Sequence, residues 1–316
     1  MKIFVTGVAG QLGHDVMNEL AARGIEGVGS DIAPVYSGVH DDTAVCSMTY
    51  ISMDITDAAA VKRTILESGA DAVIHCAAWT AVDAAEDEEN QKKVQSINAE
   101  GTANIANICK ELGIKMMYIS TDYVFNGQGE IPWKPDCRDY APLNVYGRTK
   151  LEGELAVSEA LDRFFIVRIA WVFGKSGNNF IKTMLKAAKT HDRLTVVNDQ
   201  IGTPTYTFDL AKLLCDMIVT EQYGYYHATN SGGYISWYDF TKEIFRQASA
   251  MGHIEYSEEK VQVVPVTTKE YGLSKAARPF NSRLDRTKLQ ESGFMPLPDW
   301  KDAVGRYLRE LDWQQL

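Results

Sequence analysis

Cysteine is scarce in this sequence and follows no pattern. Five of the 316 residues are cysteine, and no two of them form the Cys-x-x-Cys spacing of a zinc or redox site. The six histidines also form no pair at metal-ligand spacing. We therefore expect reduced thiols and no metal site, and we expect His75, inside the apolar run at residues 72–77, to be a hydrogen-bonded core residue. The cysteines are Cys46, Cys76, Cys109, Cys137 and Cys215.

Long hydrophobic runs and an excess of positive charge are also missing. No apolar stretch approaches the roughly 20 residues that cross a bilayer, and residues 1–6 read as a strand without the pattern of a secretory signal. With 32 Lys and Arg against 42 Asp and Glu, the net charge is −10. This balance argues against nucleic acid or an anionic membrane surface as the main partner. We expect a cytoplasmic protein with no nucleic-acid or membrane partner.

The apolar residues that are present are arranged for an α/β fold. A chain of 316 residues with 45% hydrophobic content can bury a large core and exceeds the usual size of one domain. We expect one large and one small domain. Strand-like and helical segments alternate without an internal repeat, which predicts a parallel sheet covered by helices on both faces. The strand-like segments are residues 2–6, 27–30, 71–76, 115–120 and 166–171, and the longest helical segment is 94–112.

Three glycines follow the first strand-like segment directly. Gly7, Gly10 and Gly13 lie between that segment and a helical pattern, in the spacing Gly-x-x-Gly-x-x-Gly. Glycine allows a tight turn and lets a pyrophosphate approach the free N–H groups at a helix amino terminus. The spacing differs by one residue from the commonest dinucleotide motif, so a purely structural glycine turn is the alternative. The position in the first strand, turn and helix unit favours a dinucleotide.

Asp31 ends the second strand-like segment, where a nucleotide-binding unit places an acidic residue on the adenosine ribose. Its carboxylate would accept hydrogen bonds from the ribose hydroxyls and would repel a 2′-phosphate. No lysine or arginine occurs between Arg23 and Lys62, so this segment favours NADH over NADPH. Two alternatives stay open: Lys62 or Arg63 folds back toward the site, or Asp31 is an ordinary loop carboxylate.

Tyr146 and Lys150 are separated by three residues and lie downstream of Thr121. At positions i and i+4 of a helix they share a face, so the phenol and the ammonium can point into one cleft. A free tyrosine has a pKa near ~10, and a neighbouring positive charge lowers it toward the range of efficient acid–base catalysis. Thr121, at the carboxyl end of a strand, would hydrogen-bond the substrate oxygen. The alternative is a chance pair of surface residues on a helix.

Together these residues resemble the extended short-chain dehydrogenase/reductase family, whose glycine motif has this spacing and whose active site combines Thr or Ser with Tyr and Lys. Residues 75–86, 120–127 and 168–174 are similar to the branch of that family that reduces dTDP-linked 4-keto sugars. The resemblance covers nearly the whole chain. It implies a Rossmann-like doubly wound parallel sheet with a smaller α/β substrate-binding domain. Residues 1–173 would form the dinucleotide-binding domain, with 205–230 returning to it, and residues 174–204 and 231–316 would form the substrate-binding domain.

Carried over position by position, the resemblance implies three groups of site residues. The catalytic residues would be Thr121, Tyr146 and Lys150. The sugar would contact Asp122, Tyr123, Trp171, Asn178 and Arg278. For the aromatic residues the alternative is packing at a cavity rim, and for the arginine it is exposure to solvent. The dinucleotide would contact Gly7, Gly10, Gln11, Leu12, Gly13, Asp31, Asp54, Ile55, Ala77, Ala78, Thr80 and Asn98, as well as Tyr146 and Lys150.

The resemblance also implies a reaction. NADH or NADPH would reduce dTDP-4-dehydro-6-deoxy-L-mannose to dTDP-L-rhamnose for polysaccharide biosynthesis, with Tyr146 as proton donor. Two other classes stay open: an epimerase or dehydratase that retains its dinucleotide, and a noncatalytic regulatory subunit that binds one. The nucleotide base of the substrate, the assembly of the chain as a homodimer, and the role of the expanded loop at residues 33–49 also stay open.

Overall fold

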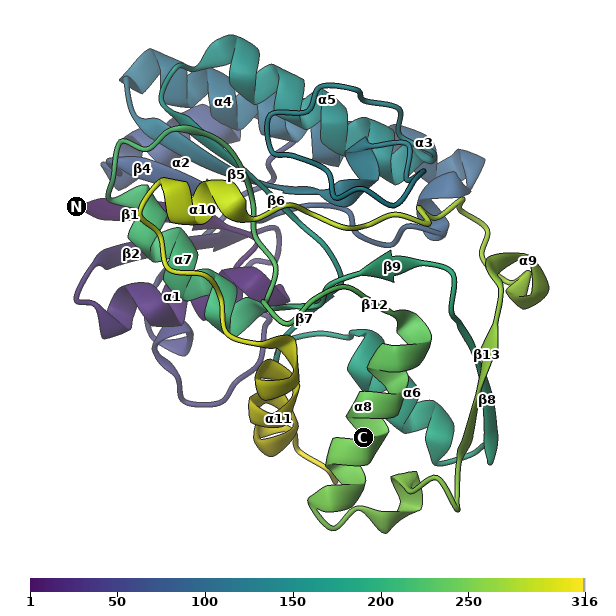
Figure 1. The fold of residues 1–316 in the computed structure, drawn as a ribbon. Helices are drawn as coiled ribbons and strands as arrows, with labels where there is room; N and C mark the ends of the chain where they lie inside the picture. Colours follow the sequence, from purple (N-terminus) through teal and green to yellow (C-terminus); the bar gives the residue numbers. More distant parts are fainter. Residues whose placement is uncertain (315) are drawn as a thin grey trace.

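A seven-stranded parallel sheet forms the centre of the larger part of the molecule (Figure 1). The computed structural model describes residues 1–314 and residue 316. The strand order β11-β6-β5-β4-β1-β2-β3 places β2 and β3 on one side of β1 and the later strands on the other. In open α/β sheets the ligand site lies at such a reversal, outside the carboxyl ends of the strands. The strands are β1 (Lys2–Thr6), β2 (Glu26–Asp31), β3 (Thr49–Ser52), β4 (Ala72–His75), β5 (Lys115–Thr121), β6 (Phe164–Ile169) and β11 (Gly224–His227).

Helices cover both faces of this sheet because its strands are apolar on both faces. Every residue of β5 is buried, and the neighbours Phe4 and Val5 of β1 belong to two different hydrophobic clusters. One cluster packs beneath α1 and α7, and the other beneath α2, α4 and α5 (Figure 1). The predicted fold class, α/β with a doubly wound parallel sheet, is confirmed. The helices are α1 (Gln11–Ala22), α2 (Ala58–Ser68), α4 (Gly101–Leu112), α5 (Val145–Ala160) and α7 (Thr207–Ile218).

The smaller part of the molecule, in the lower half and at the right of Figure 1, contains the longer helices α6, α8 and α11 and short strands. Its core is aromatic, with Phe173 stacked on Tyr206 at 5.1 Å between ring centroids. The helices are α6 (Phe180–Ala188), α8 (Trp237–Ala250) and α11 (Trp300–Glu310). The paired strands are β7 (Val172–Phe173) with β10 (Thr205–Tyr206), β9 (Ile201–Gly202) with β12 (Ile235–Ser236), and β8 (Arg193–Val197) with β13 (Gln262–Val266).

The remaining elements are short. Helix α10 packs beside β11, and its Leu289 joins the cluster beneath α1 and α7, so this late segment returns to the larger part. The short elements are η1 (Ala44–Cys46), η2 (Ala84–Glu86), α3 (Glu88–Gln95), the π-helical turn η3 (Ser96–Glu100), η4 (Asp122–Val124), η5 (Ile254–Tyr256), α9 (Thr268–Tyr271) and α10 (Thr287–Glu291).

Two elements differ from the sequence prediction. The helix predicted over residues 94–112 is interrupted by η3, because the buried Asn98 turns its amide to the backbone of Trp79. The strand predicted to reach Trp171 ends at Ile169. Trp171 instead has φ +52°, a left-handed conformation that is rare for a bulky residue. Both differences lie beside the cavity described below.

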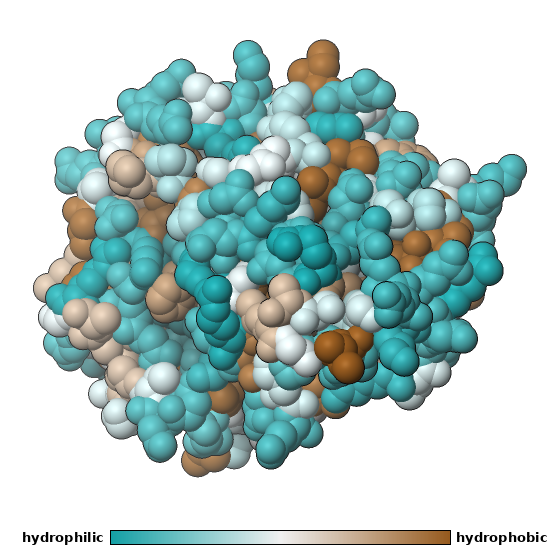
Figure 2. Space-filling model, turned by 60° about the horizontal axis from the view of Figure 1, so that its bottom comes forward, coloured by the Kyte–Doolittle hydropathy of each residue, from teal (hydrophilic) through white to brown (hydrophobic). Residues whose placement is uncertain are grey.

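The surface is mostly hydrophilic on the face shown in Figure 2, with hydrophobic residues in separate small groups. Among the described residues, no helix is long and apolar enough to span a membrane. All five cysteines are free thiols, two of them buried.

Candidate active site

A cavity of about 700 Å³ opens at the carboxyl edge of the sheet, between the larger and the smaller part. The ends of β1, β2, β4, β5 and β6 contribute to its lining, together with the start of α1 and of α5. The structure therefore collects segments that are far apart in the chain. The predicted site residues that line the cavity are Gly7, Gly10, Gln11, Leu12, Gly13, Asp31, Asp54, Ile55, Ala77, Ala78, Thr80, Thr121, Asp122, Tyr123, Tyr146, Lys150, Trp171 and Asn178.

The glycine turn has the steric form that a close backbone approach requires. Gly7 has φ +73°, and a Cβ atom there would lie 2.6 Å from the backbone nitrogen of Ala77. A Cβ on Gly13 would collide with the carbonyl oxygen of Gly7. Gly10 caps α1 without a side chain, so the first N–H groups of the helix stay available to an anion.

Two buried hydroxyl groups in the cavity lining support the same reading. Ser30 Oγ and Ser120 Oγ are buried and have no hydrogen-bond partner among the described residues. Buried polar groups in native proteins are paired as a rule, so these two oxygens fit a polar ligand. Together with the glycine turn, they make the lining suitable for a dinucleotide.

Asp31 lies where the sequence predicts it, at the end of β2 and in the cavity wall. One carboxylate oxygen accepts from Ile32 N at 2.8 Å and the other from Ala9 N at 3.1 Å. These bonds fix the carboxylate while leaving lone pairs for further donors. Within the described residues, Lys150 is the one Lys or Arg in the cavity lining. Lys62, proposed as a residue that could fold back, is paired with Glu111 at 2.6 Å.

Helix α5 positions Tyr146 and Lys150. Asn144 caps the helix by accepting from Gly147 N at 2.8 Å, which sets the first turn so that both side chains reach the cavity. Thr121, at the end of β5, accepts from Tyr123 N at 3.2 Å and donates to Asp122 Oδ1 at 3.1 Å. The structure therefore brings the three residues into the lining of one cavity, and the burial of Lys150 excludes a chance pair of surface residues.

The electrostatics of the pair differ from the expectation. Burial raises the pKa of Tyr146, and the Lys150 ammonium donates to the carbonyl oxygen of Ile119 at 2.7 Å and lies 4.1 Å from the ring centre of Tyr118. Burial lowers the pKa of Lys150 to about 7, against the opposing effect of Glu154. Tyr146 therefore keeps its proton at neutral pH, the state that a proton donor needs.

Acidic and aromatic side chains complete the wall beside Thr121. Burial raises the pKa of Asp122 to about 6, and its Oδ2 has no partner among the described residues. Tyr123 meets Tyr146 edge to face at 5.6 Å between ring centroids. Trp171 stacks on Trp237 of α8 at 3.7 Å, and Asn178 lies exposed at the rim.

Two predicted contacts are not in the cavity lining. Asn98 is buried in η3. Its side-chain oxygen accepts from Trp79 N, and its NH₂ group donates to Trp79 O and Thr149 Oγ1. It fixes the backbone before Thr80 and does not itself face the cavity. Arg278 is not a free solvent-exposed arginine either, because it is paired with Asp83 at the edge of the site.

Some lining residues were not found from the sequence. Ser120 adjoins Thr121 and could have been inferred from that position, but Trp237 comes from α8, far along the chain, and carries no local signal. His75 is a core residue, as expected. It is buried, hydrogen-bonded to Thr6 at 2.7 Å and Thr102 at 3.1 Å, and burial lowers its pKa to about 3. Among the described residues, no group of three or more His, Cys, Asp or Glu is placed to hold a metal ion.

The chain has close relatives over its full length. A family model described as RmlD substrate binding domain matches residues 1–313. The dTDP-4-dehydrorhamnose reductases of Shigella flexneri and Escherichia coli are each 38% identical to it, over 98% of this chain and 98% of the relative.

Solved structures agree with these relatives. The crystal structure of a dTDP-4-dehydrorhamnose reductase from Clostridium acetobutylicum has a TM-score of 0.85 and 37% identity, and covers 100% of both chains. The Bacillus anthracis enzyme, determined in complex with NADP, has a TM-score of 0.83 and 35% identity, over 98% of this chain and 99% of that one. The chain therefore belongs to the RmlD substrate binding domain family, which includes the dTDP-4-dehydrorhamnose reductases.

Proposed function

We propose that this protein reduces dTDP-4-dehydro-6-deoxy-L-mannose to dTDP-L-rhamnose with a nicotinamide dinucleotide, in polysaccharide biosynthesis. The observation that carries the proposal is that Thr121, Tyr146 and Lys150 line the same cavity as the glycine turn. The relatives named above are dTDP-4-dehydrorhamnose reductases, and the similarity extends over 98% of their length. A nicotinamide dinucleotide, when bound, supplies the hydride.

The side chains have separate tasks in this proposal. Tyr146, which burial keeps protonated, donates a proton to the oxygen of the 4-keto group as negative charge develops on it. The hydroxyl of Thr121 holds that oxygen by a hydrogen bond. Lys150, in the ammonium form that Glu154 favours and that predominates below about pH 7, would then stabilise the phenolate that Tyr146 becomes. Such a charge is worth more in this buried wall than in water.

The other predicted contacts remain part of the proposal. Gly7, Gly10, Gln11, Leu12 and Gly13 would hold the diphosphate, Asp31, Asp54 and Ile55 the adenosine, and Ala77, Ala78 and Thr80 the nicotinamide side. Asn98 would support this side from outside the lining, through its bonds to the backbone of Trp79. Asp122, Tyr123, Trp171 and Asn178 would form the sugar side. Arg278 would act at the rim, where it lowers the pKa of Tyr123 against the larger effect of burial.

We infer a preference for NADH over NADPH. Asp31, in the cavity lining at the end of β2, would repel a 2′-phosphate on the adenosine ribose, and Lys150 is the one lysine or arginine of the described lining that could offset it. The Bacillus anthracis relative was determined in complex with NADP, so the preference of this protein for NADH needs a direct measurement. The ratio of kcat/KM for the two reductants answers it directly.

Three further expectations belong to the proposal. Residues 1–173 with 205–230 would form the dinucleotide-binding domain, and residues 174–204 and 231–316 the substrate-binding domain, although α10 packs on the larger part. The protein would act in the cytoplasm. A homodimer is the assembly to test by sedimentation.

The deciding experiment mixes purified protein with NADH or NADPH and dTDP-4-dehydro-6-deoxy-L-mannose, and follows both reductant absorbance and sugar product. One reductant oxidised for each dTDP-L-rhamnose formed supports the proposal. Turnover of the sugar without net oxidation would instead indicate an epimerase. Dinucleotide binding without any turnover would indicate a regulatory subunit. Replacing dTDP by UDP in the substrate tests the choice of base.

A further inference from the structure

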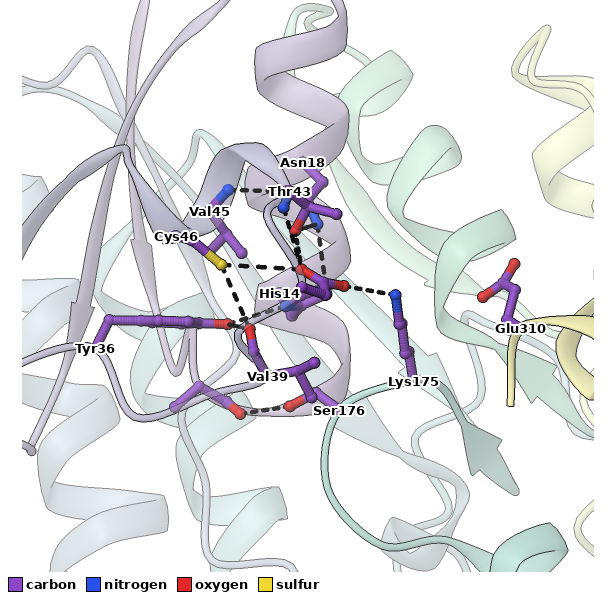
Figure 3. Close-up of polar contacts among 12 residues, drawn as sticks. His14, Asn18, Tyr36, Val39, Thr43, Val45, Cys46, Lys175, Ser176 and Glu310 are labelled. Atoms are coloured by element: carbon purple, nitrogen blue, oxygen red, sulfur yellow. Dashed lines mark hydrogen bonds and ion pairs between the residues drawn. The ribbon is translucent and has the colours of Figure 1, made fainter. Parts of the chain in front are cut away.

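The segment of residues 174–179 from the smaller part lies across the glycine turn and is tied down at three points. Lys175 Nζ pairs with Asp41 of the expanded loop at 2.6 Å, and Ser176 Oγ donates to the carbonyl oxygen of Ala9 at 2.8 Å. Figure 3 shows Lys175 reaching toward the cluster around His14 and Thr43, and Ser176 below His14 beside Val39. The third tie is Asn179, which meets Gln11 of α1.

The orientation of the Asn179 amide is fixed by its role at the start of α6. Its Oδ1 accepts from Lys182 N at 3.1 Å, so the oxygen must face the helix. Its NH₂ group therefore faces the other way, where its two hydrogens are shared among Gly174 O at 2.9 Å, Tyr307 Oη at 2.8 Å and Gln11 Oε1 at 3.1 Å. Asn179 is buried, at 8% exposed, so water does not compete freely for these bonds.

The orientation of Gln11 follows from that of Asn179. An amide NH₂ cannot face another NH₂, so Gln11 must turn its oxygen to Asn179. Its own NH₂ group is then left pointing away from Asn179, and it makes no hydrogen bond within the described part of the chain. Gln11 lines the cavity directly at the amino terminus of α1. A donor at this place suits an anion, whereas the oxygen in the same place would repel one.

We propose that Asn179 is a positioning residue for the dinucleotide diphosphate: it locks the Gln11 side chain with its NH₂ group toward the cavity. A residue of the smaller part thereby completes the diphosphate site of the larger part. This inference rests on the dinucleotide binding of the proposed function, and on no step of the reaction itself. It gives the segment at residues 174–179 a second role, besides the proposed sugar contact of Asn178 at the cavity rim.

The test uses the full-length protein and equilibrium binding. Asn179→Ser keeps an N-cap oxygen for α6 and removes the amide NH₂. We expect the Kd for NADH and for ADP-ribose, which has the diphosphate but no nicotinamide, to rise about tenfold, as for a lost hydrogen bond to a charged group. Binding of adenosine, which has no phosphate, should not change.

A double-mutant cycle separates positioning from a general loosening of the structure. In a Gln11→Ala background, Asn179→Ser should have no further effect on the Kd for ADP-ribose. Tyr307→Phe is the matched control, because it removes another partner of Asn179 while leaving the bond to Gln11 in place. We expect it to bind ADP-ribose as the wild type does.

Each outcome decides the inference. Equal weakening in the Gln11→Ala background, equal weakening by Tyr307→Phe, or unchanged binding by folded Asn179→Ser overturns it. If Asn179→Ser does not fold, Asn179→Asp is used instead, because it preserves both the size of the side chain and the N-cap. It must weaken ADP-ribose binding in the wild-type background, and it must weaken binding less in the Gln11→Ala background. Failure of the wild type to bind NADH would overturn the proposed function instead.

Discussion

The proton on Tyr146 is the residue-scale feature on which the reaction depends. Burial keeps it in place at neutral pH. We expect Tyr146→Phe to lower kcat by about 10² to 10⁴, the range for loss of a general acid, with the Kd for NADH unchanged. Steady-state rates and fluorescence titration with NADH measure the two quantities. Tyr271→Phe is the control, because it removes a phenol of α9 that lies outside the cavity lining. Near-normal turnover by folded Tyr146→Phe would contradict the assignment.

The charge on Asp31 governs a second residue-scale property, the choice of reductant. We expect Asp31→Ser to lower the ratio of kcat/KM for NADH to that for NADPH by about tenfold, or about 1.4 kcal/mol, because the repulsion of a 2′-phosphate is removed. Asp71→Ser changes a carboxylate outside the cavity lining and should leave the ratio as it is. An unchanged ratio in Asp31→Ser would show that Asp31 is an ordinary loop carboxylate.

Asp15 of α1 links stability to pH. Burial raises its pKa to about 7 in the folded protein, and its Oδ2 has no partner among the described residues. Thr207, Glu310, Lys175 and Asp41 also act on it, with smaller effects. Because the folded state holds this proton more tightly than the unfolded state, the stabilisation is fully present below about pH 4 and is lost as the pH rises toward 7.

Asp15→Asn removes this linkage while keeping the shape of the protonated carboxyl group. We expect the variant to match the wild type near pH 4 and to exceed its free energy of unfolding by about 2–4 kcal/mol at pH 8. Urea unfolding at several pH values measures the difference. The idea fails if the gap between the two proteins does not widen with pH.

At the scale of elements, the turn between β1 and α1 separates two effects of glycine. Gly7 and Gly24 both have positive φ, but a Cβ on Gly7 would meet Ala77, whereas the space around Gly24 is open. We expect Gly24→Ala to cost about 1 kcal/mol of stability and to bind NADH normally. Gly7→Ala should lose more stability and also bind NADH at least tenfold more weakly. Thermal unfolding and NADH titration of both variants test this pair.

The same elements show how far the sequence determines the site. The strands, the glycine turn, Asp31 and the pair on α5 have local signals: apolar runs, glycine spacing and the i, i+4 relation. The π-helical turn at Ser96–Glu100 has none, because it depends on Asn98 meeting Trp79 from a distant segment. Trp237 and the burial that raises the pKa of Tyr146 are likewise products of tertiary packing.

At the scale of the whole molecule, the two parts are joined by more than the cavity. Arg306 of α11, in the smaller part, pairs with Asp209 of α7 beneath the sheet at 2.7 Å, and the Asp209 side chain is 3% exposed. The chain also crosses between the two parts more than once. After β10 it forms α7 and β11 of the larger part and then returns to β12 and α8 of the smaller part. These crossings favour unfolding as one unit.

We expect a single cooperative transition, in which far-UV circular dichroism and tryptophan fluorescence give the same midpoint. Fluorescence weights the smaller part, since Trp171, Trp237, Trp300 and Trp313 lie in its core region. Arg306→Gln leaves the buried Asp209 carboxylate with its bond from Asn230 Nδ2 but without a cation. It should lower the free energy of unfolding by about 1–3 kcal/mol, equally by both probes. Arg246→Gln breaks an exposed pair on α8 and should cost less than about 1 kcal/mol.

NADH at about 100 times its Kd should raise the free energy of unfolding measured by both probes by the same amount, about 2.7 kcal/mol. The reason is that a ligand that binds only the folded state stabilises every part that unfolds with the site. Two separated transitions, with NADH moving only one of them, would show instead that the parts fold independently. In that case the ties at Arg306 and Asn179 would hold two domains in register without making them one cooperative unit.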